Sequence, residues 1–491
     1  MDMARQIRQL SKDTLVYGLG AALQGSVVLL LFPIYTRLLT QEEYGAQDLV
    51  VSAITILIYL LALGLDSAAA RYYYDAPDPV HRTTTLSTWL WIELLVSVPI
   101  CAVLIVLARP ICALVFQQQD LAPFFRLGVA SIPFYLTTRV ATMTLRLTFQ
   151  ARKFALLAAL GALAEVSAAV VLVAVLHLGI EGVFLTMLIA SSVQTLVGLS
   201  LTHRHFGPLF SSRLLRAMLA FGLPLVPASL SLWMLSYSNR YFLTRTGTLS
   251  DIALLGVAVR LSAVISLINA AFQYAWPPFA YSLLQDRELA RATYSKVLTF
   301  FLLITLLVTV GLAVFAREAL LILAPPSYAP SAQLVPWLCY STIAWGLAGI
   351  VSIGFEIAKK SYHFTVATIL GASITTGLNL LLISRWGVIG AVVATMLGNL
   401  AALSYCYVSG QHHFHIDYEV RKVLTIAAAA TLTIVAARAV DRAFVIWEPE
   451  ILLYKMLLCL LFVASLPLLQ VIKLSELPIM RRRKGDPCAP G

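Results

Sequence analysis

Long apolar windows recur along the whole chain and limit the folds that it can adopt. About 14 windows of 18 or more mostly apolar residues are separated by short polar joints, and windows of this length are typical of membrane-spanning helices. They lie roughly at residues 14–38, 46–69, 86–107, 124–146, 155–177, 183–203, 217–240, 252–277, 297–316, 334–355, 363–384, 388–408, 423–440 and 452–471.

Composition excludes a soluble enzyme as the default class. The chain of 491 residues is 60% hydrophobic and 12% charged, whereas an ordinary globular chain is about a quarter charged. The windows are continuous runs of Leu, Ala, Val and Ile, without the alternation of a membrane β-barrel. We therefore predict an all-α polytopic membrane protein, whose first window is too long for a cleaved signal peptide and is retained as an anchor.

The distribution of basic residues predicts the orientation in the membrane. The net charge of +11 would suit a nucleic-acid partner if the basic residues formed one soluble patch. With the N-terminus inside and the sides alternating, roughly 23 of the 35 Lys and Arg residues fall on the cytoplasmic side. This bias predicts that both termini are cytoplasmic, so we expect no nucleic acid as a partner. The basic tail "RRRK" at residues 481–484 is interpreted as a topology signal and headgroup anchor.

Cysteine and histidine give no metal or disulfide pattern. Five of the six cysteines lie alone in apolar stretches and the sixth lies in the C-terminal tail. The "HHFH" run at residues 412–415 could bind a metal ion, but a solvated cytoplasmic joint is the preferred interpretation. No cofactor or metal is predicted.

An internal repeat predicts the domain organisation. "LARPICALVF" from residue 107 resembles "FAREALLILA" from residue 315, and "LGIEG" from residue 178 resembles "WGVIG" from residue 386. These and three further matches keep the same order at offsets of about 203 to 208 residues. Six helices in each repeat would make the copies parallel, as two lobes around a central cavity. The predicted domains are residues 1–210, residues 211–410, and residues 411–491 with two extra helices and the basic tail.

Several soft motifs carry a resemblance to a known family. They are "YTRLLTQEEYGAQDLV" after the first window, "GLDSAAARYYYD" ending the second, "NRYFLTRTGTLSDIALLGVAVRL" across the seventh and eighth, "AFQYAWPPF" closing the eighth, and the joints "FQARK" and "FEIAKK". Together with the twelve-plus-two window count, the chain resembles the polysaccharide transporter branch of the MOP flippase superfamily. This branch comprises the Wzx-type O-antigen and exopolysaccharide flippases, which are similar to MATE exporters and lipid II flippases.

The resemblance implies a function and partners. It implies movement of an undecaprenyl-diphosphate-linked oligosaccharide from the inner to the outer leaflet of the bacterial cytoplasmic membrane, by alternating access and without catalysis. The implied partners are this lipid-linked oligosaccharide, membrane lipids, and polysaccharide polymerase or assembly proteins. A lipid II flippase and a MATE-type cation or drug exporter remain open as alternatives. An enzyme is disfavoured because every joint between windows is about 20 residues or fewer, too short for a catalytic outer domain.

Arg260 is the most conspicuous candidate for binding the cargo. It lies about eight residues, or roughly 12 Å, from the outer end of the eighth window, where a guanidinium is costly unless it faces protein or water. The second repeat offers no acid at comparable depth. Either Arg260 snorkels or pairs with an acid of the first lobe, or it lines an electropositive cavity and meets the diphosphate or an acidic sugar. The second interpretation is preferred.

The other candidate residues fall into two groups. Arg37 and Arg240, at matching outer ends of the first and seventh windows, and Arg71, at the cytoplasmic mouth, are candidate cavity residues or headgroup anchors. The second group is a possible ion-pair or coupling set. In it, Arg139 is expected to pair with Glu93 or Glu165, Glu165 could be a protonatable coupling site, and Asp66 is a further member.

Overall fold

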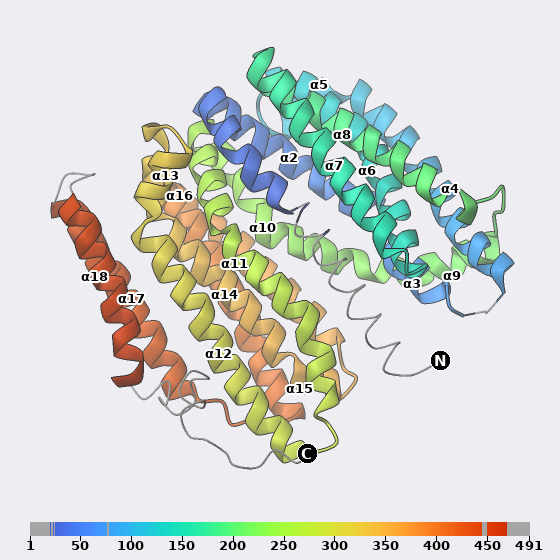
Figure 1. The fold of residues 1–491 in the computed structure, drawn as a ribbon. Helices are drawn as coiled ribbons and strands as arrows, with labels where there is room; N and C mark the ends of the chain where they lie inside the picture. The colour runs from blue at the N-terminus through green and yellow to red at the C-terminus, as the bar shows by residue number, and fades with distance from the viewer. Residues whose placement is uncertain (1–19, 21–22, 24, 76–77, 444–448, 469–491) are drawn as a thin grey trace, which may run out of the picture. The chain divides into compact units, whose positions relative to one another are not determined.

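The computed structural model describes residues 20, 23, 25–75, 78–443 and 449–468 (Figure 1). Regular structure in this part of the chain is helical throughout, with no strand. Eleven of the helices described are long and apolar enough to cross a membrane, and Gly25–Leu38 forms a shorter apolar helix. The predicted all-α polytopic membrane fold is therefore confirmed. The count of 14 spans and the layout of the two repeats stay predictions.

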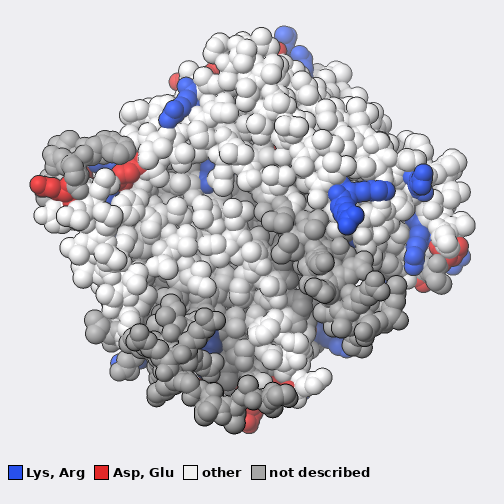
Figure 2. All heavy atoms as spheres, in the orientation of Figure 1, with Lys and Arg blue, Asp and Glu red and all other residues white. Residues whose placement is uncertain are grey.

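Apolar side chains face outward over much of the helical surface. Leu114, Val106 and Leu196 are 81%, 75% and 70% exposed, and Figure 2 shows a face on which Lys, Arg, Asp and Glu are sparse. An apolar exterior of this extent is expected where lipid tails replace water as the surrounding medium.

The chain divides into two compact units, each built from more than one stretch of sequence. Unit 1 takes the described residues of Met1–Arg260 together with Leu323–Tyr328 and Thr368–Gly398. Unit 2 takes those of Leu261–Ile322, Ala329–Ala367 and Asn399–Gly491. Each unit thus draws on both halves of the sequence, and the division at residues 210 and 410, which follows the repeat, stays a prediction.

Unit 1 contains the helices of the first half of the chain. These are Gly25–Leu38, α2 (Gln41–Leu61), α3 (Leu65–Tyr72), α4 (Pro79–Val106), α5 (Ala108–Val115), α6 (Ala122–Leu147), α7 (Ala151–Ala169), α8 (Gly179–Thr202), α9 (Ser212–Gly222) and α10 (Val226–Thr246). The first part of α11 (Leu249–Ser282) and the middle of α16 (Tyr362–His413) also belong to it. Helix α6 packs against α4 and α8, and α2 packs against α6 and α10.

Local sequence explains where α2 begins and how it continues into α3. The Thr40 hydroxyl accepts from the Glu43 backbone N–H, and the Glu43 carboxylate accepts from the Thr40 backbone N–H, which is a capping box. Between α2 and α3, Gly64 has a left-handed φ of 66°, and a Cβ there would lie 2.4 Å from the carbonyl oxygen of Gly222. This turn directs α3 onto α9, over a core that includes Leu65, Trp89, Val140 and Met218.

Unit 2 contains α12 (Arg287–Val314), α13 (Ala316–Leu323), α14 (Val335–Val351), α15 (Ile353–Ile357), α17 (Val420–Ala443) and α18 (Pro449–Leu468), with the remaining parts of α11 and α16. Helix α17 packs between α12 and α18. The fully buried Lys455 ammonium of α18 lies 2.5 Å from a carboxylate oxygen of Glu318 and 2.6 Å from one of Asp441. A buried charge needs a partner, and this ion triad supplies one. The triad thereby links the last two helices, α17 and α18, to α13.

Helix α16 is interrupted where the sequence separates two windows. Gly387 has φ 54° and ψ −130°, so the assigned helix consists of two segments on either side of it. The predicted windows 363–384 and 388–408 lie on these two segments. Gly179, the matching glycine of the first predicted repeat, has a φ of 56°.

Candidate functional site

Unit 1 contains an open cavity of about 650 Å³. Side chains from Gly25–Leu38, α2, α3, α6, α7 and α8 line it, and Arg260 is the contribution of α11. Five charged side chains take part: Arg139, Arg146, Arg260, Asp66 and Glu165. Three cations and two anions leave the lining with one positive charge in excess.

The cavity is elongated along the helices that form it. On α6 the lining residues extend from Tyr135 to Arg146, and on α8 from Val183 to Gln194. At a rise of about 1.5 Å per residue, either stretch measures roughly 16 Å. Apolar residues of Gly25–Leu38 (Val27, Val28 and Leu31) line it together with amides and hydroxyls (Gln47, Gln194, Thr138 and Ser191). The cavity therefore offers an extended molecule both charged and polar contacts.

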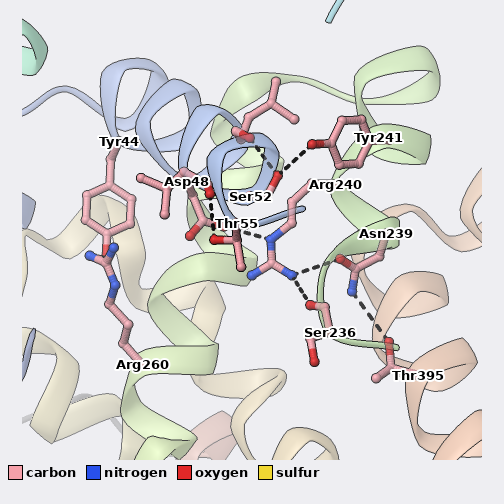
Figure 3. Close-up of polar contacts among 12 residues, drawn as sticks. Tyr44, Asp48, Ser52, Thr55, Ser236, Asn239, Arg240, Tyr241, Arg260 and Thr395 are labelled. Carbon is pink, nitrogen blue, oxygen red and sulfur yellow. Dashed lines mark hydrogen bonds and ion pairs between the residues drawn. The ribbon is translucent and has the colours of Figure 1, made fainter. Parts of the chain in front are cut away.

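Arg260 lies half-buried at this cavity and is held by an aromatic side chain. Its Nη1 donates to the hydroxyl of Tyr44, and its guanidinium carbon lies 4.7 Å from the centre of the Tyr44 ring (Figure 3). Within the described residues, no carboxylate forms an ion pair with it. The expectation that Arg260 lines a cavity agrees with this placement, while pairing with an acid does not.

Close packing of α11 on α2 fixes where Arg260 lies. A Cβ on Gly45 would lie 1.9 Å from the carbonyl oxygen of Leu249, and a Cβ on Gly256 would lie 3.1 Å from the carboxyl carbon of Asp48. Small residues at these two positions let the helices approach closely, as is common between membrane helices. Tyr44 and Asp48 are one turn apart on α2, so one face of this helix meets both α10 and α11.

Arg139 is paired at the cavity with a different acid from the two that were predicted. Its Nη2 lies 2.6 Å from a carboxylate oxygen of Asp66, with both side chains about one-third exposed. The turn at Gly64 sets Asp66 at the start of α3 beside α6, which gives this pair its geometry. Glu165 lines the same cavity without an ion pair, and Glu93 is buried, again without one, in the part of the chain that the structure describes. The structure thus joins Arg139, Asp66 and Glu165 in one site.

Arg240 lies outside the cavity lining, in a buried polar network. Its side chain is 2% exposed, and its Nε lies 2.9 Å from a carboxylate oxygen of Asp48 (Figure 3). Its Nη1 donates to the backbone oxygen of Ser236 at 2.6 Å and to Oδ1 of Asn239 at 2.9 Å. The interpretation of Arg240 as a cavity-rim residue is replaced by that of a buried ion pair between α2 and α10. Asp48 neutralises the charge of Arg240 inside the protein.

The other two candidate arginines, Arg37 and Arg71, also lie outside the lining. Arg37 is exposed at the end of Gly25–Leu38. Arg71 is 60% exposed and forms an ion pair of 2.5 Å with Asp75, one turn further along the chain. Neither guanidinium lies at the cavity. Both arginines are therefore interpreted as headgroup anchors or surface residues.

Sequence reasoning missed two side chains that matter at this site. Arg146 lines the cavity seven residues after Arg139, and this two-turn spacing, which places both on one face of α6, was available as a signal. Tyr44, which holds Arg260, gave no comparable signal, because a tyrosine near a helix start is common and its partner lies 216 residues away. Among the described residues, no group of three or more His, Cys, Asp or Glu is arranged to hold a metal ion.

Comparison with known proteins places the chain in a family. The family of polysaccharide biosynthesis proteins matches residues 10–284, more than half of the chain. The chain belongs to this family. The resemblance to the polysaccharide transporter branch of the MOP flippases is thereby confirmed.

Solved structures share the fold at low sequence identity. The lipid II flippase MurJ, in an inward closed conformation, is 13% identical with a TM-score of 0.74, covering 92% of this chain and 98% of that one. An inward-facing multidrug resistance MATE transporter of the MOP superfamily is 18% identical with a TM-score of 0.68, covering 79% and 94%. A mutant of the Vibrio cholerae MATE transporter VcmN is 16% identical with a TM-score of 0.58, covering 82% and 96%. No curated protein sequence matches the chain significantly.

Proposed function

We propose that this polysaccharide biosynthesis protein is a flippase for an undecaprenyl-diphosphate-linked oligosaccharide. It moves the cargo from the inner to the outer leaflet of the bacterial cytoplasmic membrane, with both of its own termini in the cytoplasm. The observation that carries the proposal is the elongated cavity of unit 1, with three arginines against two acids and with Arg260 outside any ion pair to a described carboxylate.

The chemistry of the lining matches the parts of such a cargo. The guanidinium of Arg260 offers a planar set of donors that suits the oxygens of a diphosphate. The amides of Gln47 and Gln194 and the exposed ring of Tyr135 suit sugar hydroxyls and sugar faces. The polyprenyl chain remains in the lipid, because burying it in a charged cavity would forfeit its favourable apolar environment.

Translocation then requires that the cavity open to each side in turn. The headgroup enters from the cytoplasm, binds to the arginines, and leaves after a conformational change reopens the cavity outside. Glu165, a cavity carboxylate outside any ion pair among the described residues, is the candidate site where a proton would drive this cycle. Polysaccharide polymerase or assembly proteins that receive the cargo are the further proposed partners.

Lipid II flipping is the second candidate function. The match to MurJ over 92% of this chain favours it, and a headgroup with a diphosphate would use the same arginines. A MATE-type exporter of cationic drugs fits the site less well, because a cavity with an excess of arginines repels cations.

The proposal is tested by accumulation of lipid-linked glycan in a strain that lacks this protein. We expect undecaprenyl-diphosphate-linked oligosaccharide to accumulate in the inner leaflet and the wild-type gene to relieve the accumulation. Arg260→Gln should reduce the flipping rate at least about tenfold, since a charge-assisted contact to phosphate is worth roughly 1.5 to 3 kcal/mol. Arg245→Gln, at an exposed position on α10 outside the cavity lining, is the matched control and should restore flipping.

The outcomes separate the candidate functions. Accumulation of the peptidoglycan precursor instead of a polysaccharide precursor would favour lipid II flipping. Unchanged lipid intermediates with altered drug tolerance would favour export. Full rescue by Arg260→Gln, at an expression level equal to the wild type, would remove Arg260 from the binding site.

A further inference from the structure

Tyr44 makes two different interactions with a single guanidinium. Its side chain is fully buried on α2, its hydroxyl accepts from Arg260 Nη1, and its ring lies 4.7 Å from the guanidinium carbon. In Figure 3 the ring stands beside the end of the arginine side chain, on the side of α2 that faces α11. A hydrogen bond and a cation–π contact together restrict the guanidinium more than either one would alone.

The other side of Tyr44 is supported by Tyr328, from a distant part of the chain. The two ring centres are 5.9 Å apart with an interplanar angle of 68°, an edge-to-face arrangement. Tyr328 is 1% exposed, and its hydroxyl has no hydrogen-bond partner among the described residues. Burial raises the pKa of this hydroxyl to about 12, so the phenol is neutral at physiological pH. The contribution of Tyr328 to this contact is therefore its ring.

Two hydrogen bonds fasten the segment that carries Tyr328. The Thr36 hydroxyl donates to the backbone oxygen of Leu323 at 3.0 Å, and the Gln41 amide donates to that of Ser327 at 2.7 Å. Residues Leu323–Tyr328 accordingly belong to unit 1, although the chain on both sides of them belongs to unit 2. The segment is thus anchored against the start of α2, where it supports the Tyr44 ring.

An ordinary core position would not explain these features together. A tyrosine buried only for packing needs no cationic partner, and its hydroxyl would be expected to meet a backbone or uncharged group. Here the hydroxyl accepts from Arg260, which lines the cavity without an ion pair to any described carboxylate. Arg146 also lines the cavity without such a pair, but no aromatic side chain is seen to hold it among the described residues. The contact with Tyr44 leaves the remaining guanidinium nitrogens of Arg260 for a ligand, since Arg carries five N–H donors.

We propose that Tyr44 is a positioning residue, buttressed by the ring of Tyr328, which orients Arg260 for an anionic headgroup in the cavity. This inference rests on the proposed function, because it takes Arg260 to bind the diphosphate. Tyr44 itself does not touch the cargo. Its effect on binding passes through the orientation of Arg260, so it disappears when Arg260 no longer carries a guanidinium.

The test is a double-mutant cycle on the full-length protein in lipid nanodiscs, with undecaprenyl diphosphate as the probe. Tyr44→Phe keeps the ring and removes the hydroxyl, and should raise the Kd by about 3- to 10-fold. In an Arg260→Gln background the same change should alter the Kd less than about twofold. Tyr241→Phe is the matched control, since it removes a half-buried hydroxyl that lies 3.2 Å from Ser52 Oγ, outside the cavity lining.

A second pair of variants tests the buttress without altering Tyr44. Tyr328→Phe retains the ring and removes only a hydroxyl without a described partner, so it should leave the Kd within about twofold. Tyr328→Ala removes the edge contact and should weaken binding in the wild type but leave the Arg260→Gln protein unchanged. This pair of variants tests the positioning of Arg260 even if Tyr44→Phe folds poorly.

The results distinguish a failure of this inference from a failure of the proposed function. If Tyr44→Phe and Tyr328→Ala weaken binding equally with and without the guanidinium, the positioning role is wrong and these tyrosines act on the cavity by another route. If Arg260→Gln weakens binding while both tyrosine variants are silent, the inference alone is overturned. If Arg260→Gln itself leaves the Kd unchanged, the assignment of Arg260 to the headgroup fails, and the inference fails with it.

Discussion

At the residue scale, α2 uses two side chains one turn apart to satisfy two arginines in different ways. Tyr44 meets Arg260 through its ring and hydroxyl, which leaves the guanidinium positive toward the cavity. Asp48 meets Arg240 through a full negative charge, which neutralises it in the interior. The role of each arginine therefore depends on its partner on α2. Arg260, held by Tyr44, remains available to a ligand at the candidate site, whereas Arg240, paired with Asp48, stabilises the fold.

The buried ion pair of Arg240 and Asp48 should lose more stability when one partner is removed than when both are removed. We expect Arg240→Gln to lower the free energy of unfolding by about 3 to 5 kcal/mol, because it leaves the carboxylate of Asp48 buried without its counter-charge. Combining it with Asp48→Asn should recover a large part of that loss. The measurement is chemical unfolding of the purified protein in detergent micelles.

The exposed pair of Arg71 and Asp75 supplies the control for this prediction. Because water screens both charges, Arg71→Gln should change the free energy of unfolding by less than about 1 kcal/mol.

The double variant tests whether the buried pair acts as a unit. If Arg240→Gln with Asp48→Asn is no more stable than Arg240→Gln alone, Arg240 and Asp48 do not act as a unit.

Residue roles were only partly predictable from the sequence, for a physical reason. The depth of Arg260 in an apolar window was enough to expect a protein-lined or water-lined environment. The acid that meets Arg139 was not predictable, since the choice of Asp66 over Glu165 depends on the direction that α3 takes after the Gly64 turn. Likewise, Arg240 lies close to the predicted outer end of its window, and only the packing of α10 on α2 shows that it is buried.

At the element scale, the helices themselves were the most predictable part of the fold. Most of each apolar window lies on helix where the structure describes it, because a backbone in lipid must satisfy its own hydrogen bonds. The turn at residues 62–64 inside the window 46–69 is an exception. Packing between distant elements was not predictable, and the insertion of Leu323–Tyr328 into unit 1 is an example. It depends on single hydrogen bonds from Thr36 and Gln41, which leave no periodic pattern in the sequence.

The break in α16 gives a prediction about glycine. Gly387 has a left-handed φ, and a Cβ on it would meet nothing within 4 Å, so the cost of Gly387→Ala is one of backbone conformation alone. We expect the substitution to lower the free energy of unfolding by about 1 to 3 kcal/mol, because φ 54° with ψ −130° is a conformation that L-residues rarely adopt. Gly377→Ala is the matched control in the same helix, with open space around its Cβ and no left-handed φ. The control should be neutral or stabilising by up to about 1 kcal/mol. If both substitutions shift the unfolding midpoint equally, the positive φ of Gly387 is wrong.

At the scale of the whole molecule, the distribution of charge predicts an orientation in the membrane. The excess of Lys and Arg on alternate joints predicts a cytoplasmic N-terminus and hence a side for every joint. A flippase that loads its cargo at the inner leaflet needs this orientation, since its opening toward the cytoplasm must be the loading side. The proposed direction of transport therefore depends on this orientation.

Two exposed glutamines provide a direct test of this orientation. Gln119, before α6, is predicted outside, and Gln285, between α11 and α12, is predicted inside. In a cysteine-free background, Gln119→Cys should react with a membrane-impermeant maleimide in right-side-out membrane vesicles. Gln285→Cys should react only after the vesicles are permeabilised. The opposite pattern would place the termini outside, against the orientation that the charges predict. Equal labelling of both positions in sealed vesicles would mean that the joints do not alternate as predicted.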